Sequence, residues 1–168
     1  AAMKDAIYAH PKARAIIGAP GKNEVGCVWV DPRTKQLCKA RTDMLRELDG
    51  YAWVWDLKTA EDASPAALSR AINQYAYHEQ GALYVDGMEV LGQEGVRYGL
   101  LVVEKEPPFG VVTRELDDAT LSLGRQKYRA NLAKYADCQS KNEWPCYPTE
   151  IDYTGVPAYA LKGWSDGD

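Results

Sequence analysis

Several charged and polar residues in the first half of the chain have the types and spacing of a hydrolytic site. Asp56-Leu57-Lys58 separates a carboxylate from an ammonium by two positions, which puts both on one face of a β-strand. Asp43 lies thirteen residues upstream, at the end of the preceding predicted strand. Two carboxylates and a backbone carbonyl, here that of Leu57, can hold Mg²⁺. Lys58 would then orient or deprotonate a water and stabilise a phosphate oxygen, so the pattern predicts metal-dependent phosphodiester hydrolysis.

Two further groups are candidates for the same site, although each also has a plainer interpretation. Glu24 opens the first predicted strand and could be a third carboxylate or a base that orients water. Gln80 and Tyr84 are four residues apart in a predicted helix, so they share a face and could bind a phosphate or a water. Alternatively, Glu24 is a solvated loop residue, the helix face is a packing surface, and Asp56-Leu57-Lys58 is a strand that reaches solvent.

The elements that must position these residues alternate between strand and helix. We predict strands over residues 24–30, 36–43, 51–58, 97–105 and 109–115. We predict helices over residues 65–86 and from Asp117-Asp118 to about residue 137, after short helical turns in residues 1–17 and before an irregular tail. Residues 31–35 have the composition of a hairpin turn, and Ser64-Pro65 is a typical helix start. This order predicts an α/β domain whose sheet is covered by helices.

Alternation along residues 51–58 assigns the two faces of the central strand. Val54, Asp56 and Lys58 share one face, whereas Trp53 and Trp55 point to the other. The two tryptophans could stack on bases, but their direction away from Asp56 favours packing in the core.

Taken as a set, these motifs resemble the PD-(D/E)XK nuclease superfamily. Its pattern is an upstream glutamate, an aspartate after a hairpin, a D/E-x-K strand and a helix with Q-x-x-x-Y, here Glu24, Asp43, Asp56-Leu57-Lys58 and residues 80–84. Roughly residues 22–115 are similar to the RecE-type (exodeoxyribonuclease VIII) nuclease domain, most clearly in the segments EVGCVWVDPRTKQLCKARTDML and WDLKTAEDASPAALSRAINQYAYHEQGALYVDG.

The resemblance implies a fold and an activity. The fold would be α/β, with a central mixed β-sheet flanked by helices in a restriction-endonuclease-like core. The activity would be a Mg²⁺-dependent exonuclease, with Mn²⁺ as an alternative metal. It would degrade one strand of linear double-stranded DNA from the 5′ end in phage-type homologous recombination, without ATP. The resemblance also implies a homo-oligomeric ring and a single-strand annealing protein as partner. An endonuclease, or a catalytically incomplete domain that binds DNA, is the alternative on the same fold.

The histidines depart from the family pattern. The family has an upstream helix with a histidine that helps to bind metal, but His10 lies in Ala-His-Pro-Lys, outside that motif. His78 is two residues from Gln80 and therefore off its helix face. We interpret residues 1–168 as a single nuclease domain from an N-terminally truncated fragment of a longer protein.

The charge pattern allows DNA binding through a local patch. Twenty basic and 24 acidic residues give a net charge of −4, which excludes a uniformly basic, histone-like surface. Four positive charges fall within nine residues of the predicted hairpin: Arg33, Lys35, Lys39 and Arg41. We expect a phosphate track there, leading along one strand face to Asp43, with a solvated hairpin as the alternative. For a second basic group, Arg125, Lys127 and Arg129, we expect a solvated helix face.

Composition places the chain among cytoplasmic proteins that are not embedded in a membrane. No apolar run approaches the roughly 20 residues of a spanning helix, and no signal peptide is evident. The four cysteines, Cys27, Cys38, Cys138 and Cys146, form no CxxC pair. We expect free thiols in a reducing compartment, with an iron–sulfur cluster as the less favoured alternative.

Overall fold

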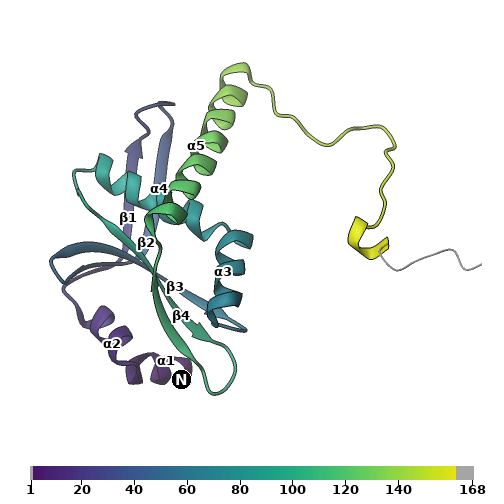
Figure 1. The fold of residues 1–168 in the computed structure, drawn as a ribbon. Helices are drawn as coiled ribbons and strands as arrows, with labels where there is room; N and C mark the ends of the chain where they lie inside the picture. Colours follow the sequence, from purple (N-terminus) through teal and green to yellow (C-terminus); the bar gives the residue numbers. More distant parts are fainter. Residues whose placement is uncertain (1, 162–168) are drawn as a thin grey trace, which may run out of the picture.

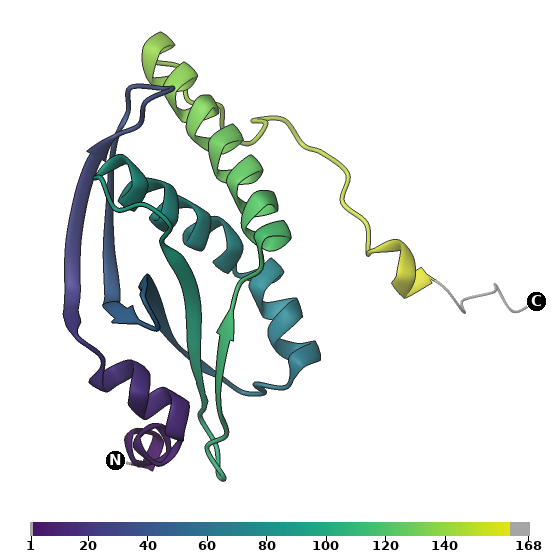
Figure 2. The same ribbon diagram turned by 60° about the vertical axis from the view of Figure 1, so that its left-hand side comes forward.

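The fold is a five-stranded mixed sheet with helices on both faces (Figures 1 and 2). It is seen in a computed structural model that describes residues 2–161. The strands are β1 (Gly21–Val30), β2 (Leu37–Leu48), β3 (Tyr51–Ala60), β4 (Arg97–Glu104) and β5 (Val111–Glu115). The helices are α1 (Ala2–Ala9), α2 (Pro11–Gly18), α3 (Pro65–Gln74), α4 (Tyr77–Val90) and α5 (Asp118–Lys141), followed by a 3₁₀ turn, Ala158–Leu161.

The sheet has its strands in sequence order, β1-β2-β3-β4-β5. Only β3 and β4 are parallel, and the other neighbours are antiparallel. A parallel pair needs a long crossover, whereas a hairpin suffices for an antiparallel pair. Helices α3 and α4 make that crossover. The predicted central mixed sheet flanked by helices is therefore confirmed.

The two faces of β3 pack into separate hydrophobic clusters. Trp53 and Trp55 stack with ring centroids 4.9 Å apart and lie with α1 and α2 in one cluster. Val54 lies on the other face, with β4 side chains such as Tyr98 and residues of α4 and α5. The expected alternation and the core location of both tryptophans are confirmed.

The predicted helix over residues 65–86 is instead two helices. Ala76 adopts a left-handed conformation with φ 55° and ψ 32°, which interrupts the helix because a Cβ is strained in that region. Tyr75 ends α3, and α4 starts in a new direction at Tyr77. Sequence pattern missed this break because neither glycine nor proline marks it. Strand β2 also extends five residues beyond the predicted end, to Leu48.

Helices α4 and α5 are joined by a buried charge cluster. Asp86 of α4 accepts from Arg125 Nε at 2.7 Å and from Arg129 Nη2 at 2.6 Å, and it also bonds the Tyr128 hydroxyl. Burial, reinforced by the Asp86 carboxylate, raises the pKa of Tyr128 to about 12. The expectation that Arg125 and Arg129 form a solvated face is therefore wrong. Their i, i+4 spacing presents both to Asp86, a partner 39 or more residues away.

The predictions for His10 and for the cysteines have different outcomes. His10 is not a free surface residue, because its Nδ1 accepts from the Ala13 amide at 3.1 Å and caps α2. The four cysteines are free thiols, as predicted. In the part of the chain that the structure describes, no helix combines the length and hydropathy needed to cross a bilayer.

Close contact between α4 and α5 depends on Gly124. A Cβ at this position would lie 2.0 Å from the His78 carbonyl oxygen, too close for any side chain to fit without moving a backbone. We expect Gly124→Ala to lower the free energy of unfolding by roughly 1–3 kcal/mol despite the better helix propensity of alanine. Denaturant unfolding measures this change. The control is Gly18→Ala at the end of α2, where nothing lies within 4 Å of the new Cβ. Equal stability of the two variants would contradict the prediction.

Candidate active site

Three of the predicted residues form a closed hydrogen-bonded group in the second half of β3, where β2 parts from it. Gln80 Nε2 donates to Asp56 Oδ1 at 3.1 Å, and Lys58 Nζ donates to Gln80 Oε1 at 3.3 Å. Lys58 also forms an ion pair with Asp56 Oδ2. The D-x-K strand and the glutamine of the following helix thus meet as the sequence predicts.

The crossover explains this meeting. Asp56 and Lys58 lie on the face of β3 that α4 covers, since side chains two apart share a strand face. After β3 the chain leaves the sheet through α3, and the left-handed Ala76 turns α4 back across that face. Gln80 lies in the first turn of α4, directly after Ala76, and its side chain therefore reaches Asp56 on β3.

Asp43 reaches the site from the neighbouring strand. The ladder between β2 and β3 ends with Met44 opposite Trp55, so the next residues along, Asp43 and Asp56, face each other where the strands part. Asp43 Oδ2 accepts a hydrogen bond from the Leu57 amide at 2.8 Å. The carboxylate thereby replaces the main-chain acceptor that this amide would have in a continued ladder.

Burial dominates the electrostatics of Asp56. Its exposed fraction is 3%, and loss of hydration raises the pKa of its carboxyl group. Lys58 opposes this shift by favouring the charged form, whereas the nearby charge of Asp43 adds to it. A cation between the two carboxylates would remove their repulsion.

Two tyrosines complete the surroundings. The Tyr77 ring lies 4.8 Å from Lys58 Nζ, a cation–π distance. Tyr98 is fully buried, and its hydroxyl has no hydrogen-bond partner among residues 2–161. Burial raises the pKa of Tyr98 well above the usual value, and the charge of Asp56 is the next contributor. Its ring occupies the space beside Gly81, where a Cβ would lie 2.7 Å from it. Sequence reasoning missed Tyr98, although it is the one aromatic residue in the apolar strand β4.

Glu24 and Tyr84 lie nearby but make other contacts. Glu24 has a left-handed backbone, φ 53°, and its carboxylate pairs with Arg41 at 2.9 Å on the exposed surface. It lines a cavity together with Asp43 and Leu57. The Tyr84 hydroxyl donates to the Arg41 carbonyl at 3.4 Å, and its ring packs edge-on against Tyr98. Their catalytic roles remain predictions.

The four basic residues of the hairpin do not form one continuous group. Arg33 and Lys35 lie in the turn, where Lys35 Nζ donates to the Pro32 carbonyl. Arg41 is engaged by Glu24, and Lys39 lines a cavity next to Gln80. Both Lys39 and Arg41 are exposed, so a phosphate can reach them, and their role in DNA binding remains a prediction.

The oxygen atoms of this site suit a hard divalent cation. Within residues 2–161, no three acidic, histidine or cysteine side chains gather as a metal-binding cluster, so the site offers two carboxylates, Asp43 and Asp56. Two are enough for Mg²⁺, which usually takes one or two carboxylates and keeps waters or substrate phosphates as its other ligands. The buried charge of Asp56 independently favours a cation here.

The geometry agrees with a family assignment made from the whole chain. Residues 1–156 match the model of a family described as a PDDEXK-like domain of unknown function (DUF3799). The chain belongs to this family. Nucleases with PDDEXK-like domains generally use divalent metals, which fits the carboxylates of the DUF3799 site. No curated protein matches the sequence.

A solved structure has a similar fold. The crystal structure of a "putative exonuclease" from Eubacterium rectale has a TM-score of 0.64 and 10% sequence identity, and the match covers 96% of this DUF3799 chain. The chain spans only 63% of that structure's length. A second structure, SSO0001, has a TM-score of 0.43 and 16% identity over 77% of this chain and 59% of its own, too low to bear on the argument. The first match shows a similar fold, and the PDDEXK-like assignment itself rests on the family model.

Metal binding at Asp43 and Asp56 predicts a stability change that can be measured without activity. Mg²⁺ or Mn²⁺ at about ten times its Kd should stabilise the folded protein by ~1.4 kcal/mol, a rise of roughly 3–6 °C in Tm for a chain of this size. Asp56→Asn should lose this rise, because the amide carries no charge for the cation. Thermal melts with and without EDTA measure it.

The matched control is Asp49→Asn, which makes the same chemical change in the exposed turn before β3. Asp49 has a φ of 54°, a conformation that asparagine tolerates. This variant should keep the full metal-dependent rise in Tm. The same rise in Asp56→Asn would remove Asp56 from the metal site.

Proposed function

We propose that this chain is the nuclease domain of a Mg²⁺-dependent exodeoxyribonuclease that degrades linear double-stranded DNA. The observation that carries the proposal is the contact of Asp56, Lys58 and Gln80 where β2 parts from β3. Asp43, on the neighbouring strand β2, accepts a hydrogen bond from the Leu57 amide beside this group. These are the groups that the D/E-x-K chemistry requires. The resemblance of residues 22–115 to the RecE-type nuclease domain favours an exonuclease among the activities of this fold.

The roles of the residues follow from their contacts. A divalent cation bound by Asp43, Asp56 and the Leu57 carbonyl would polarise the scissile phosphate and acidify a water. Lys58 holds its ammonium between Asp56 and Gln80, half-buried and still within reach of solvent. From there it can orient the attacking water and donate to a phosphate oxygen. Gln80 fixes that position, because its amide NH₂ group holds Asp56 while its carbonyl holds Lys58.

The finer features of the proposal rest on the resemblance. They are 5′ to 3′ polarity, a role in phage-type recombination, a ring-shaped homo-oligomer and a single-strand annealing partner. The DNA backbone would contact Lys39 and Arg41 near the site and Arg33 and Lys35 in the hairpin turn. The ion pair of Arg41 with Glu24 does not prevent this, because an exposed pair is weak and a phosphate can replace the carboxylate.

An incomplete, DNA-binding domain is the second candidate. Glu24 faces Arg41 rather than the paired carboxylates, and His10 and His78 are occupied as a helix cap and as a partner of the Ile72 carbonyl. Such a domain would bind DNA and metal without turnover. An endonuclease of the same fold is the third candidate.

A nuclease assay on linear and closed circular duplex DNA separates the three candidates. We expect Mg²⁺-dependent loss of linear DNA only, because an exonuclease needs an end. Lys58→Ala should remove turnover while the metal-dependent rise in Tm persists, since lysine does not ligate the cation. Cleavage of the circle would favour the endonuclease, and inactivity of the unaltered chain would favour the DNA-binding domain.

Gln80 gives an independent test of the geometry. We expect Gln80→Ala to lower the cleavage rate roughly 10- to 100-fold, as loss of a group that orients metal ligands does, and to lower Tm far less, because Lys58 still pairs with Asp56. The control is Gln126→Ala, an exposed helical glutamine of α5, which should leave the rate unchanged. A fall in Tm with an intact rate would show instead that Gln80 only packs the helix on the sheet.

A further inference from the structure

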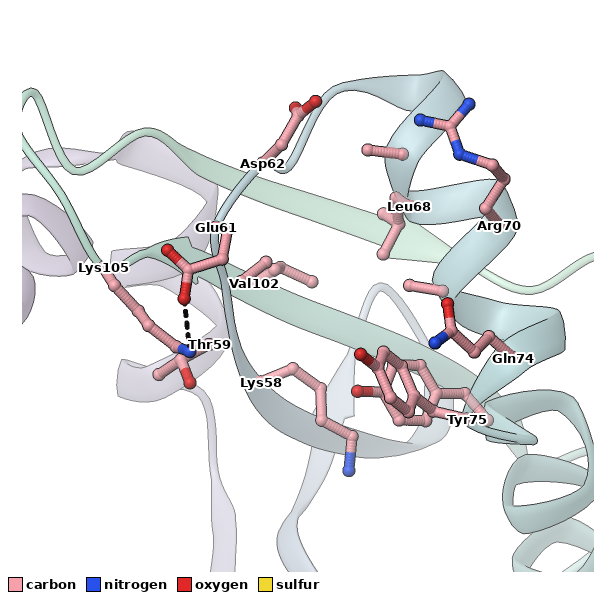
Figure 3. Close-up of a pocket in the computed structure, with 14 residues that line it drawn as sticks. Lys58, Thr59, Glu61, Asp62, Leu68, Arg70, Gln74, Tyr75, Val102 and Lys105 are labelled. Atoms are coloured by element: carbon pink, nitrogen blue, oxygen red, sulfur yellow. Dashed lines mark hydrogen bonds and ion pairs between the residues drawn. The ribbon is translucent and has the colours of Figure 1, made fainter.

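A cavity of about 330 Å³ opens beside Lys58, between the end of β3 and helix α3. Figure 3 shows Lys58 extending from the strand, with Gln74 and Tyr75 projecting from the helix side. The volume of the cavity lies at the lower end of the range for small-ligand sites, about 300–1000 Å³. The cavity therefore begins at the proposed reaction centre and continues away from it.

Tyr75 also lines a second cavity. This one measures about 560 Å³ and lies among α4, α5 and β2, where its lining includes Gln80 and Lys39. Tyr75 is the aromatic side chain common to both cavities. The two cavities therefore share Tyr75. Lys58 lines the first cavity and Gln80 lines the second, and these two side chains are hydrogen-bonded to each other.

A strained backbone holds Tyr75 at this junction. Ala76, the next residue, adopts the left-handed conformation that separates α3 from α4. The break leaves Tyr75 60% exposed, with its ring 5.7 Å from that of Tyr77. Strain of this kind persists where surrounding structure enforces it, and it concentrates at functional sites.

The charges along the two cavities suit a phosphate backbone. Arg70 in the first and Lys39 in the second form no salt bridge within residues 2–161. The Ser64 amide lowers the pKa of the Asp62 carboxyl group, and the nearby charge of Arg70 adds to this effect. Among the acids of the lining, Glu61 pairs with Lys105 at 2.7 Å. Asp62 and Glu79 accept hydrogen bonds from neutral donors, the Ser64 amide at 2.7 Å and Asn131 at 3.3 Å, and keep their charge. Free basic groups on either side of an exposed aromatic ring are the arrangement that binds single-stranded nucleic acid.

We propose that Tyr75 stacks on a nucleobase of a single DNA strand that lies across both cavities, next to the phosphodiester at Lys58. The inference extends the proposed nuclease function and names the form of DNA that reaches the site. A base inside a duplex has both faces covered by its stacked neighbours, so a stretch of strand that continues past Tyr75 must be unpaired there. Stacking on an aromatic ring does not depend on base identity, so the contact holds the strand without sequence preference.

The experiment measures binding of a single-stranded DNA oligonucleotide of about eight nucleotides, within the usual range of site sizes. Fluorescence anisotropy in EDTA reports affinity without cleavage. A second probe of equal length carries the same phosphates and sugars but no bases. The proteins are the unaltered chain, Tyr75→Ala, Tyr75→Phe and Tyr8→Ala, a control tyrosine of comparable exposure on α1.

Tyr75→Ala should bind the intact oligonucleotide roughly 5- to 100-fold more weakly and the baseless one as the unaltered chain does. Tyr75→Phe should restore binding, because stacking needs the ring and not the hydroxyl, and Tyr8→Ala should change nothing. Unchanged affinity of Tyr75→Ala for the intact probe would overturn the inference. So would an equal loss for both probes, which would point to a fold defect.

The result is separable from the proposed function. A chain that shows the base-dependent loss at Tyr75 but does not cleave DNA would refute the nuclease and leave the strand site standing. A chain that cleaves linear DNA and binds the intact probe equally well with Tyr75→Ala would refute the strand site alone.

Discussion

The carboxylate of Asp56 is almost fully removed from water, and the site is arranged around its charge. An unpaired buried charge costs several kcal/mol, so Asp56 must be met by cations and hydrogen-bond donors. Lys58 and Gln80 supply these from the same strand and from the covering helix. The second carboxylate, Asp43, works against them by raising the pKa of Asp56. Two acids held together in this way are unfavourable alone and favourable around a metal ion.

The change of strand direction at β3 makes that arrangement possible. Strand β2 runs antiparallel to β3, and β4 runs parallel to β3. A hairpin therefore joins β2 to β3, whereas the crossover through α3 and α4 joins β3 to β4. The hairpin delivers Asp43 to the point where β2 and β3 separate. The crossover returns α4 over the same point and delivers Gln80. Figure 2 shows α4 lying beside α5 on one side of the sheet.

Of the non-glycine residues with positive φ in residues 2–161, two lie close to the site, and the others lie in turns and at a helix end. Glu24 and Ala76 both have positive φ, and neither is a residue that favours this region. Glu24 lies between the β1 residues that pair with Thr42 and Met44, so its strain falls opposite Asp43. Ala76 sets the angle of α4. Sequences that specify a fold consistently tend to depart from local rules at functional positions, and both departures adjoin the Asp43–Asp56–Lys58 group.

The sequence by itself determined the order of the strands, the two faces of β3 and four of the residues that meet where β2 parts from β3. These are Asp43, Asp56, Lys58 and Gln80, whereas Glu24 and Tyr84 make other contacts. The order of the strands and the two faces of β3 follow from short-range periodicity: alternation separates Asp56 and Lys58 from Trp53 and Trp55, as the two clusters confirm. Only the tertiary structure decided the break at Ala76, the pairing of Arg125 and Arg129 with Asp86, and the position of the Tyr98 hydroxyl. Each depends on contacts between segments distant in the chain. Such contacts have no local periodicity, because packing and burial, rather than neighbouring residues, select them.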